Sequence, residues 1–534
     1  MLYNEQLISQ GSDPYDYTQW TGNTDWQNEI FQTGFLTNNN VSITGATDKS
    51  KFYLGLGYVM EEGSIKTEKL NKFTVNLNSE YSVTDFLRFG FQLNGVRAKY
   101  PDAKGVDGAL KAAPIAPTHD LESGLIHTLP DFQRAQVWNP LIETELRGAH
   151  NKSENYRVAG NVFGEIDILK NLTFKATFSM DYASNNGRTY QPIVKVYDPT
   201  VSGNIATLGT GKTEVSQFKE NETKVQSDYV LTYTNSFDNG NHNLTATAGF
   251  TTYYNSLSRL DGARKQGVGL VIPNDPDKWF VSIGDAATAT NGSTQWERST
   301  LSMLARVIYN YKGKYLFNGS FRRDGSSAFS YTGNQWQNFY SVGAGWLMSE
   351  EEFMKDITWL DMLKLKGSWG TLGNQNLDKA YPAEPLLTNA YSAVFGKPSA
   401  IYPGYQLAYL PVTPNCAGRT VEASGSPVQK PTSSATACTL KGCTYKKKTK
   451  DLLAEVPGIS GTIPGIGNLG SIENSGVELA LSWRDRIGDW NYNIGMNLAT
   501  IKNKVLSLVQ EGYSIIVRRQ AAELHNGRIP HRLL

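Results

Sequence analysis

The sequence has no long apolar run and almost no excess of charge of one sign. Its 51 basic and 50 acidic residues give a formal net charge of +1, so there is no electrostatic case for binding nucleic acid. No stretch approaches the roughly 18 consecutive apolar residues of a membrane-spanning helix, and the mean hydropathy is −0.40. A bundle of transmembrane helices is therefore excluded. Membrane-spanning strands remain open, because half of each such strand is polar.

Cysteine and histidine are also scarce, and neither is arranged for metal binding or catalysis. The three cysteines are Cys416, Cys438 and Cys443, and the six histidines are His119, His127, His150, His242, His525 and His531. None of them has the spacing of a zinc site. The neighbouring Glu350, Glu351 and Glu352 do not form the opposed carboxylate pair of a glycosidase. We therefore predict no metal, no cofactor, no catalytic residue and no enzyme activity.

A signal peptide is absent from residues 1–20, which contain no charged segment followed by an apolar one. A chain with the membrane-spanning strands of an outer-membrane barrel would have to be exported. We therefore expect that the true beginning of the protein lies upstream of this sequence.

The clearest positive feature is strict alternation over residues 172–182 (LTFKATFSMDY). Successive side chains of a strand point to opposite faces, so this segment has one apolar and one polar face. Its length matches the about 9 to 11 residues with which a tilted strand crosses a bilayer. Aromatic residues form 11% of the chain, including 28 Tyr and 11 Trp, as in the interfacial girdles of outer-membrane barrels.

The same pattern recurs along the chain, and roughly fourteen strands fit it. The other candidates are residues 51–60, 72–77, 87–93, 156–168, 229–237, 242–254, 301–311, 315–321, 339–348, 363–369, 476–483 and 490–500. Short turns at 170–171, 238–241 and 312–314 alternate with long loops at 100–154, 185–223 and 254–294. Residues 349–359 have capping-box spacing from Ser349 to Glu352, but we favour a polar connector there.

Several segments resemble the SusC/RagA family of TonB-dependent outer-membrane transporters of the Bacteroidetes. They are residues 23–35 (NTDWQNEIFQTGF), 320–329 (SFRRDGSSAF), 341–356 (SVGAGWLMSEEEFMKD), 363–376 (LKLKGSWGTLGNQN) and 467–483 (GNLGSIENSGVELALSW). They occur in family order. The resemblance implies an all-β fold, a large antiparallel transmembrane β-barrel of the TonB-dependent receptor type, located in the outer membrane.

Set against the family, the chain is expected to be incomplete, with the plug domain and the closing strands absent. We assign residues 1–36 to a linker that follows the missing plug and 37–410 to barrel strands and loops. Residues 445–509 are assigned to further strands, while 411–444 and 510–534 are anomalous. The resemblance implies import of glycan or peptide fragments with a SusD-like surface lipoprotein and the TonB complex, in contact with outer-membrane lipid.

The anomalous window 411–444 holds all three cysteines, lacks Phe, Tyr and Trp, and has no period of two. Read from the third base of each codon, residues 429–444 can instead encode an aromatic-rich strand, so we favour a shifted reading frame. Residues 524–534 behave similarly in another frame, which is consistent with a frame error after about residue 517. One alternative is a disulfide between Cys438 and Cys443 inside an exported loop, and another is a genuine loop and tail of unusual composition.

Residues that contact a substrate cannot be named from the sequence, but several candidates can be weighed. Lys175, Asp181, Arg88 and Gln92 fall on polar faces and are expected to line the barrel interior. Arg322, Arg323 and Asp324 precede Gly-Ser-Ser, and a charged interior or loop cluster explains them better than a phosphate site. Aromatics of the loops could stack on sugar rings, although such residues more often fill loop cores; they are Trp138, Tyr190, Tyr197, Trp279, Tyr391 and Tyr402.

The sequence thus favours the central portion of a TonB-dependent importer of oligomeric nutrients. Two alternatives stay open: a passive porin-type barrel, and a secreted all-β protein that binds or cleaves glycans. Strands of about 5 to 6 residues with inward apolar faces would favour the secreted protein.

Overall fold

The computed structural model describes residues 2–100, 105–134, 136–147, 150–332, 335–356, 362–375, 387–395, 400–407, 419–425, 428–430, 437–455 and 466–507. Within these residues, no helix has the length and apolar character needed to cross a membrane.

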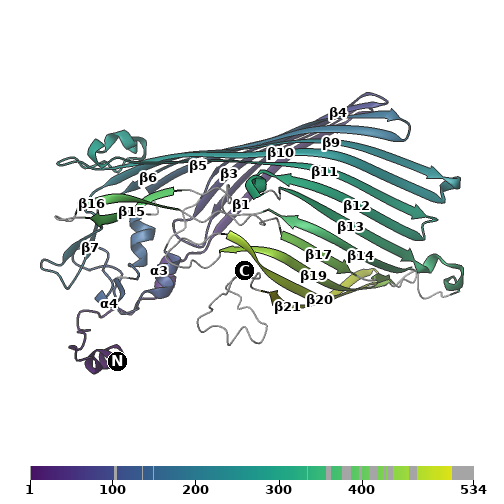
Figure 1. Cartoon of the computed structure of the whole chain (residues 1–534). Coiled ribbons are helices and arrows are strands. Elements are labelled where there is room, and N and C mark those ends of the chain that lie inside the picture. Colours follow the sequence, from purple (N-terminus) through teal and green to yellow (C-terminus); the bar gives the residue numbers. More distant parts are fainter. Residues whose placement is uncertain are drawn as a thin grey trace.

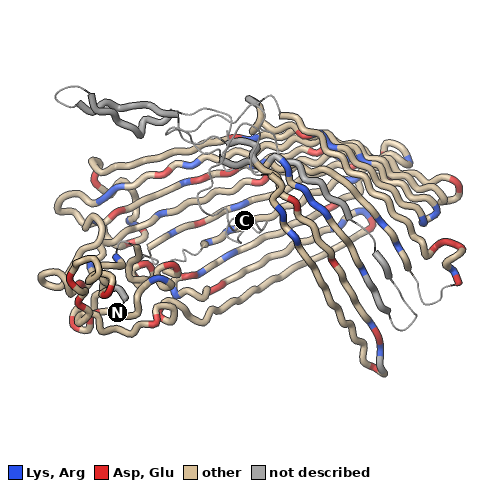
Figure 2. The backbone as a smooth tube through the Cα atoms, turned by 60° about the horizontal axis from the view of Figure 1, so that its bottom comes forward, with Lys and Arg blue, Asp and Glu red and all other residues tan. Residues whose placement is uncertain are grey.

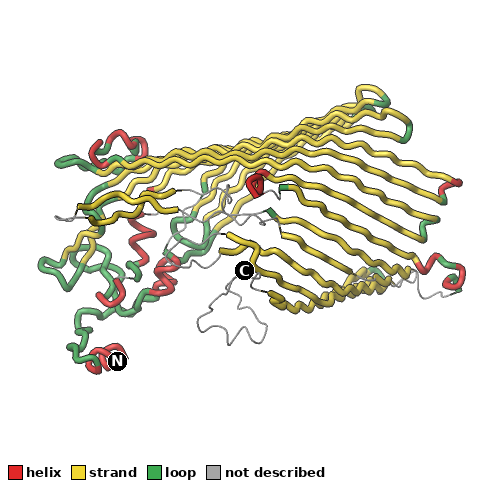
Figure 3. The backbone as a smooth tube through the Cα atoms, viewed as in Figure 1, coloured by secondary structure: helices red, strands yellow, loops and turns green. Residues whose placement is uncertain are grey.

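One curved 17-stranded sheet dominates the structure (Figures 1 and 3). Its strands are β1 (Phe35–Ala46), β2 (Ser50–Glu62), β3 (Lys69–Thr84), β4 (Leu87–Lys99), β5 (Asn151–Leu169), β6 (Leu172–Gln191), β9 (Glu214–Phe237), β10 (His242–Lys265), β11 (Thr290–Tyr311), β12 (Tyr315–Ser326), β13 (Trp336–Leu347), β14 (Met362–Asn374), β17 (Arg419–Gly425), β18 (Val428–Lys430), β19 (Ala437–Glu455), β20 (Ile466–Ile487) and β21 (Trp490–Ser507). Its strands follow chain order, with β17 and β18 both lying between β14 and β19. All pairings in this sheet are antiparallel, which confirms the predicted all-β antiparallel class.

The predicted hairpins form in the expected register. Phe178 of β6 lies opposite Val162 of β5 across the turn at 170–171. The β9–β10 and β11–β12 pairs close at 238–241 and 312–314. Gly240 and Gly313 take φ values of +92° and +68°, a backbone region that glycine enters without steric cost.

The strands are longer than alternation alone indicated. β9 and β10 have 24 residues each, so parts of the predicted loops 185–223 and 254–294 belong to strands. Those added residues lie beyond the length that crosses a bilayer. Their pairing continues without interruption because backbone hydrogen bonds do not depend on apolar side chains. The predicted boundaries were wrong there, and the strands rise past the membrane.

The two ends of the sheet differ (Figure 1). Tight turns join the strands at one end, while the other carries the long connections and most of the helices. Helices at the long-loop end are α2 (Trp26–Ile30), α3 (Val106–Lys111), α4 (Asp131–Arg134) and the π-helix η1 (Ile142–Arg147), and α1 (Leu2–Ser9) lies near the N-terminus. Two small hairpins lie outside this sheet: β7 (Val194–Tyr197) with β8 (Ile205–Leu208), and β15 (Leu387–Phe395) with β16 (Ala400–Leu407). Outer-membrane barrels place their longer loops outside the cell.

Short 3₁₀ segments lie in several of the connections. They are η3 (Asp238–Gly240), η4 (Pro276–Lys278), η5 (Val281–Ile283), η6 (Ala286–Thr288), η7 (Ser327–Thr332), η8 (Met348–Glu350) and η9 (Glu352–Met354). The last two form the described part of the connection between β13 and β14. They confirm the polar connector that we favoured over a capped helix.

The buried core lies in the loops and not between layers of the sheet. Trp20, Trp26 and Ile30 of the N-terminal segment pack against residues of the 105–147 connection and of β7. We call this assembly, residues 15–34, 105–147 and 194–208, the loop unit. A second small core joins Tyr190, Val215, Ile272 and Trp279 where the 266–289 loop folds over the tips of β6 and β9.

The anomalous window is partly paired. β17, β18 and the start of β19 lie within it, although its sequence shows no alternation. Cys438 and Cys443 lie five residues apart in the same strand, a separation of roughly 16 Å at the usual rise. A disulfide requires Cα atoms less than about 7 Å apart, and Cys443 is a free thiol. The disulfide alternative was therefore wrong; Cys416 and residues 510–534 lie outside the described residues.

Candidate functional site

Register sorts the side chains of the sheet onto two faces. Phe91, Val162 and Phe178 lie in one row, and exposed apolar residues continue on that face across neighbouring strands. Lys175, Asp181, Arg88 and Gln92 lie on the opposite face, as alternation predicted. We call this opposite face of β4, β5, β6, β9 and β10 the polar wall. Basic and acidic residues are spread along its strands (Figure 2).

Near the tight turns, the polar wall carries a compact charged cluster. Arg88 pairs with Glu165 at 2.6 Å and with Asp167 at 3.4 Å. Lys175 pairs with Glu165 at 3.5 Å, and its ammonium lies 4.1 Å from the ring centroid of Phe163. Neighbouring strands supply each partner, so antiparallel pairing is what brings them together.

Towards the long-loop end, a second charged cluster occupies the same wall. Arg157 donates two hydrogen bonds to the carboxylate of Asp181, from Nε at 2.8 Å and from Nη2 at 2.5 Å. Glu220 accepts hydrogen bonds from Asn185 at 3.0 Å and from Arg259 at 3.3 Å. Beside it, Asn255 donates to Glu222 at 3.2 Å.

A polar hollow of about 280 Å³ separates the two clusters. It is lined in part by Asn94, Ser179, Lys224, Gln226 and Tyr253. Amide, hydroxyl and charged groups thus alternate along the wall. Such a surface can donate to and accept from the many hydroxyls of a glycan or the amides of a peptide.

The ion pairs of the wall remain partly solvated. Arg157 keeps 52% of its side-chain exposure and Lys175 keeps 43%. Exposed pairs of this kind contribute only about 0–1 kcal/mol each. They can therefore be exchanged for contacts with a bound solute at little cost.

The cluster at residues 322–324 is divided between the two faces. Arg322 donates to Asp324 at 2.7 Å and to Ser302 at 3.0 Å on the polar side. Arg323 lies on the apolar side, where its guanidinium carbon is 5.2 Å from the ring centroid of Trp336. Alternation within β12 accounts for this separation. The prediction that all three residues form one charged cluster was therefore wrong. Arg322 and Asp324 do lie together on the polar face.

The loop aromatics mostly fill cores. Tyr190 and Trp279 stack with centroids 5.5 Å apart, and both are buried. Tyr197 packs against His127 at 5.0 Å, while Trp138 is exposed. Tyr391 and Tyr402 belong to β15 and β16, but their side chains lie outside the described residues. Among the described aromatics of this group, Trp138 is the one still available for stacking on a ligand.

A buried ion pair fixes the loop unit. Arg134 reaches Asp198 with two nitrogens at 2.7 and 2.8 Å, and Asp198 is only 2% exposed. Burial opposes ionisation of Asp198, but hydrogen bonds from Arg134 and Thr200 outweigh it, so the pKa of this carboxyl lies below its usual range. The sequence gives no sign of this pair, because its members lie 64 residues apart.

His127 is the buried titratable group of the same unit. Its ring contacts Trp20 at 5.3 Å, and its Nδ1 lies 2.9 Å from the carbonyl oxygen of Thr128. Burial lowers the pKa of this imidazole below its ordinary value. No group of three or more potential metal ligands occurs in the described part of the chain.

The chain is similar to known outer-membrane receptors in sequence and to solved structures in fold. No protein-family model matches the chain. It is 27% identical over 512 residues to TonB-dependent receptor P3 of Formosa agariphila, covering 92% of this chain and 48% of the relative. It is 26% identical over 530 residues to TonB-dependent receptor SusC of Bacteroides thetaiotaomicron, covering 91% of this chain and 49% of SusC.

Solved structures give the same fold. The RagAB peptide importer in its closed-closed state matches with a TM-score of 0.75 at 21% identity, covering 92% of this chain and 53% of that one. The fold is that of an outer-membrane β-barrel of the TonB-dependent receptor type. More particularly, the chain is a homologue of receptors of the SusC/RagA type, as the sequence motifs predicted. It spans about half the length of the curated relatives that it matches.

Proposed function

We propose that this chain is part of an importer that carries oligomeric nutrients across the outer membrane, driven by TonB. The polar wall is the single observation that most supports this proposal, because it provides a continuous hydrophilic surface along strands whose other face is apolar. Kinship with TonB-dependent receptors supports the energy coupling. The protein would catalyse no covalent reaction and hold no cofactor.

The proposed partners and substrate are based on the same similarity to TonB-dependent receptors. We propose a SusD-like surface lipoprotein at the long-loop end, together with the TonB complex on the periplasmic side. The mixed amide and charged side chains of the wall suit oligosaccharides and oligopeptides alike. The neighbour RagAB is described as a peptide importer, which keeps peptides beside glycans as the substrate class.

Uptake by cells carrying the intact gene tests this function. Labelled oligosaccharides and oligopeptides are supplied with and without a protonmotive-force uncoupler, and cells lacking the gene serve as the control. We expect gene-dependent uptake of one substrate class that stops when the uncoupler is added. Uptake that persists in the uncoupler would establish the passive porin instead, and the absence of any gene-dependent uptake would remove the transport function.

A further inference from the structure

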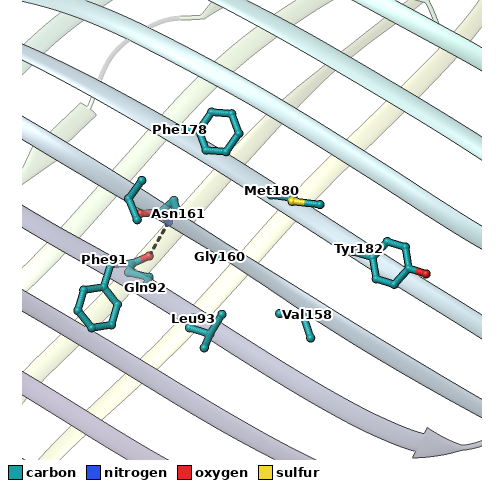
Figure 4. A pocket seen from close by; sticks show the side chains of 10 residues that line it. Phe91, Gln92, Leu93, Val158, Gly160, Asn161, Phe178, Met180 and Tyr182 are labelled. Carbon is teal, nitrogen blue, oxygen red and sulfur yellow. Dashed lines mark hydrogen bonds between the residues drawn. The ribbon is translucent and has the colours of Figure 1, made fainter.

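The apolar face of the sheet has a hollow centred on Gly160 (Figure 4). Leu93, Val158, Phe178 and Met180 are among the side chains that surround it, and its volume is about 540 Å³. Gly160 lines the hollow without a side chain, and an added Cβ would lie 2.6 Å from the carbonyl oxygen of Gln92. The hollow is thus a gap between side chains on a face that meets lipid.

A second hollow lies further along the same strands, towards the long loops. The register aligns Lys152, Arg188 and Gln217 on the same face as the apolar hollow. Those three side chains help to line a niche of about 420 Å³. The 266–289 loop folds over it, placing Asp277 3.4 Å from Lys152 and the ring of Phe280 4.0 Å from the Arg188 guanidinium carbon.

Positive charge predominates around this niche. Arg97 and Lys99 share one carboxylate, Glu154, at 3.2 and 3.5 Å. Glu154 also lines the niche, and the exposed Lys219 pairs in register with Asn186 at its wall. Lys152 and Arg188 thus line the niche against Glu154, which Arg97 and Lys99 also contact. Lys219 lies at a neighbouring register position, and the loop adds Asp277 and the paired Asp275 and Lys278. An anionic group carrying several oxygens can be accommodated there.

The spacing of the two hollows matches one leaflet of a membrane. Gly160 and Lys152 are eight residues apart on β5, roughly 26 Å along the strand at the usual rise. Barrel strands tilt by about 40°, which reduces this to roughly 20 Å along the membrane normal. Half of the hydrocarbon core is about 15 Å thick. An acyl chain in the apolar hollow would therefore place its headgroup at the level of the niche.

We propose that this outer surface binds a phosphorylated, acylated lipid of the external leaflet. Its phosphate lies between Lys152 and Arg188 beneath the 266–289 loop, and an acyl chain occupies the hollow at Gly160. This site is on the opposite face from the polar wall. The proposal rests on the sheet being embedded in the outer membrane and is independent of what the protein transports.

Native mass spectrometry of the full chain in non-ionic detergent tests the site, with bisphosphorylated lipid A as the probe. We expect the double variant Lys152→Gln, Arg188→Gln to weaken binding by tenfold or more, on the order of what one or two charge-assisted hydrogen bonds contribute. The matched control, Lys49→Gln with Lys170→Gln, makes the same charge change at the tight-turn end and should bind as the parent does. Equal loss in both variants, or loss in neither, would overturn the proposal.

Two further measurements distinguish a lipid site from a simple phosphate site, and a single variant controls for misfolding. Lipid A without phosphates should bind the parent chain as weakly as lipid A binds the double variant. Millimolar inorganic phosphate should not displace lipid A; displacement would identify a simple anion site and contradict the proposal. Should the double variant fail to fold, Lys219→Gln changes an exposed side chain only and should still weaken binding severalfold.

Discussion

At the residue scale, Arg134 and Asp198 form a buried ion pair between segments 64 residues apart. Arg134 also donates from Nε to the carbonyl oxygen of Leu129 at 2.7 Å and from Nη2 to the hydroxyl of Thr128 at 3.1 Å. One guanidinium thus joins the helix α4 to the β7–β8 hairpin. A buried pair of this kind fixes geometry, and removing one partner leaves a charge without compensation.

We predict that Arg134→Met destabilises the loop unit by about 3–5 kcal/mol, because the carboxylate of Asp198 stays buried without its cation. Amide hydrogen exchange over residues 105–147 and 194–208 measures the change. Lys111→Met is the matched control, since its pair with Asp107 is exposed and contributes about 0.3–0.5 kcal/mol. Equal effects of both substitutions would contradict this account.

A pH dependence follows from His127. The pKa of His127 is lowered in the folded state. Below the ordinary imidazole pKa of about 6.5, the unfolded chain therefore binds a proton at His127 more readily than the folded chain does. The stabilisation from the neutral imidazole is therefore present above that pH and is lost as the pH falls below it. We expect exchange protection of the loop unit to decrease between about pH 7 and pH 5, and His127→Gln to remove that slope. A slope that survives the substitution would assign the effect to another group.

At the element scale, β6 illustrates how one strand serves two environments. Met180 faces the apolar side with 46% of its surface exposed, while Ser179 belongs to the polar wall. Consecutive residues of the same strand therefore meet lipid and water respectively. The sequence alternation of this segment is the direct consequence.

Met180→Lys is predicted to lower the free energy of unfolding of the sheet in lipid by about 2–4 kcal/mol, because the ammonium enters the hydrocarbon. Ser179→Lys, one residue away, should cost far less, since its side chain enters the polar wall. Denaturant titration of the chain in phospholipid vesicles compares the two variants. If both cost the same, the assignment of the faces is wrong.

At the scale of the whole molecule, the exposed apolar face of the sheet is expected to make the chain depend on detergent or lipid to stay in solution. Large apolar residues are exposed on one face along the sheet, among them Phe52, Val75, Leu231 and Trp369. We predict that the purified chain aggregates when detergent is removed and returns to a sheet of the same circular dichroism when detergent is restored. A chain that stayed monomeric without detergent would favour the secreted glycan-binding protein.

The window at 411–444 gives a prediction for the gene. Its composition contrasts with the rest of the chain, although β17 and β18 are paired within the sheet. We propose that this window was read out of frame. Resequencing codons 405–450 should restore an alternating, aromatic-containing strand. An unchanged sequence would establish a true cysteine-containing segment.

The sequence by itself determined the alternating strands of this protein and the hairpins that they form. Alternation in segments such as β6, together with the turns at 238–241 and 312–314, was enough to predict antiparallel hairpins, because side-chain direction in a strand is a local property. The same rule placed Lys175, Asp181, Arg88 and Gln92 on one polar face. The family motifs indicated a transporter of the SusC/RagA type.

Only the tertiary structure decided which distant residues meet. The pair of Arg134 with Asp198, the stack of Tyr190 on Trp279 and the loop folded over Lys152 and Arg188 each join segments 60 or more residues apart. No periodic signal precedes such contacts, because they depend on the packing of irregular loops. The extension of β9 and β10 beyond the membrane was likewise hidden, since strand pairing there continues in polar sequence where alternation has ended.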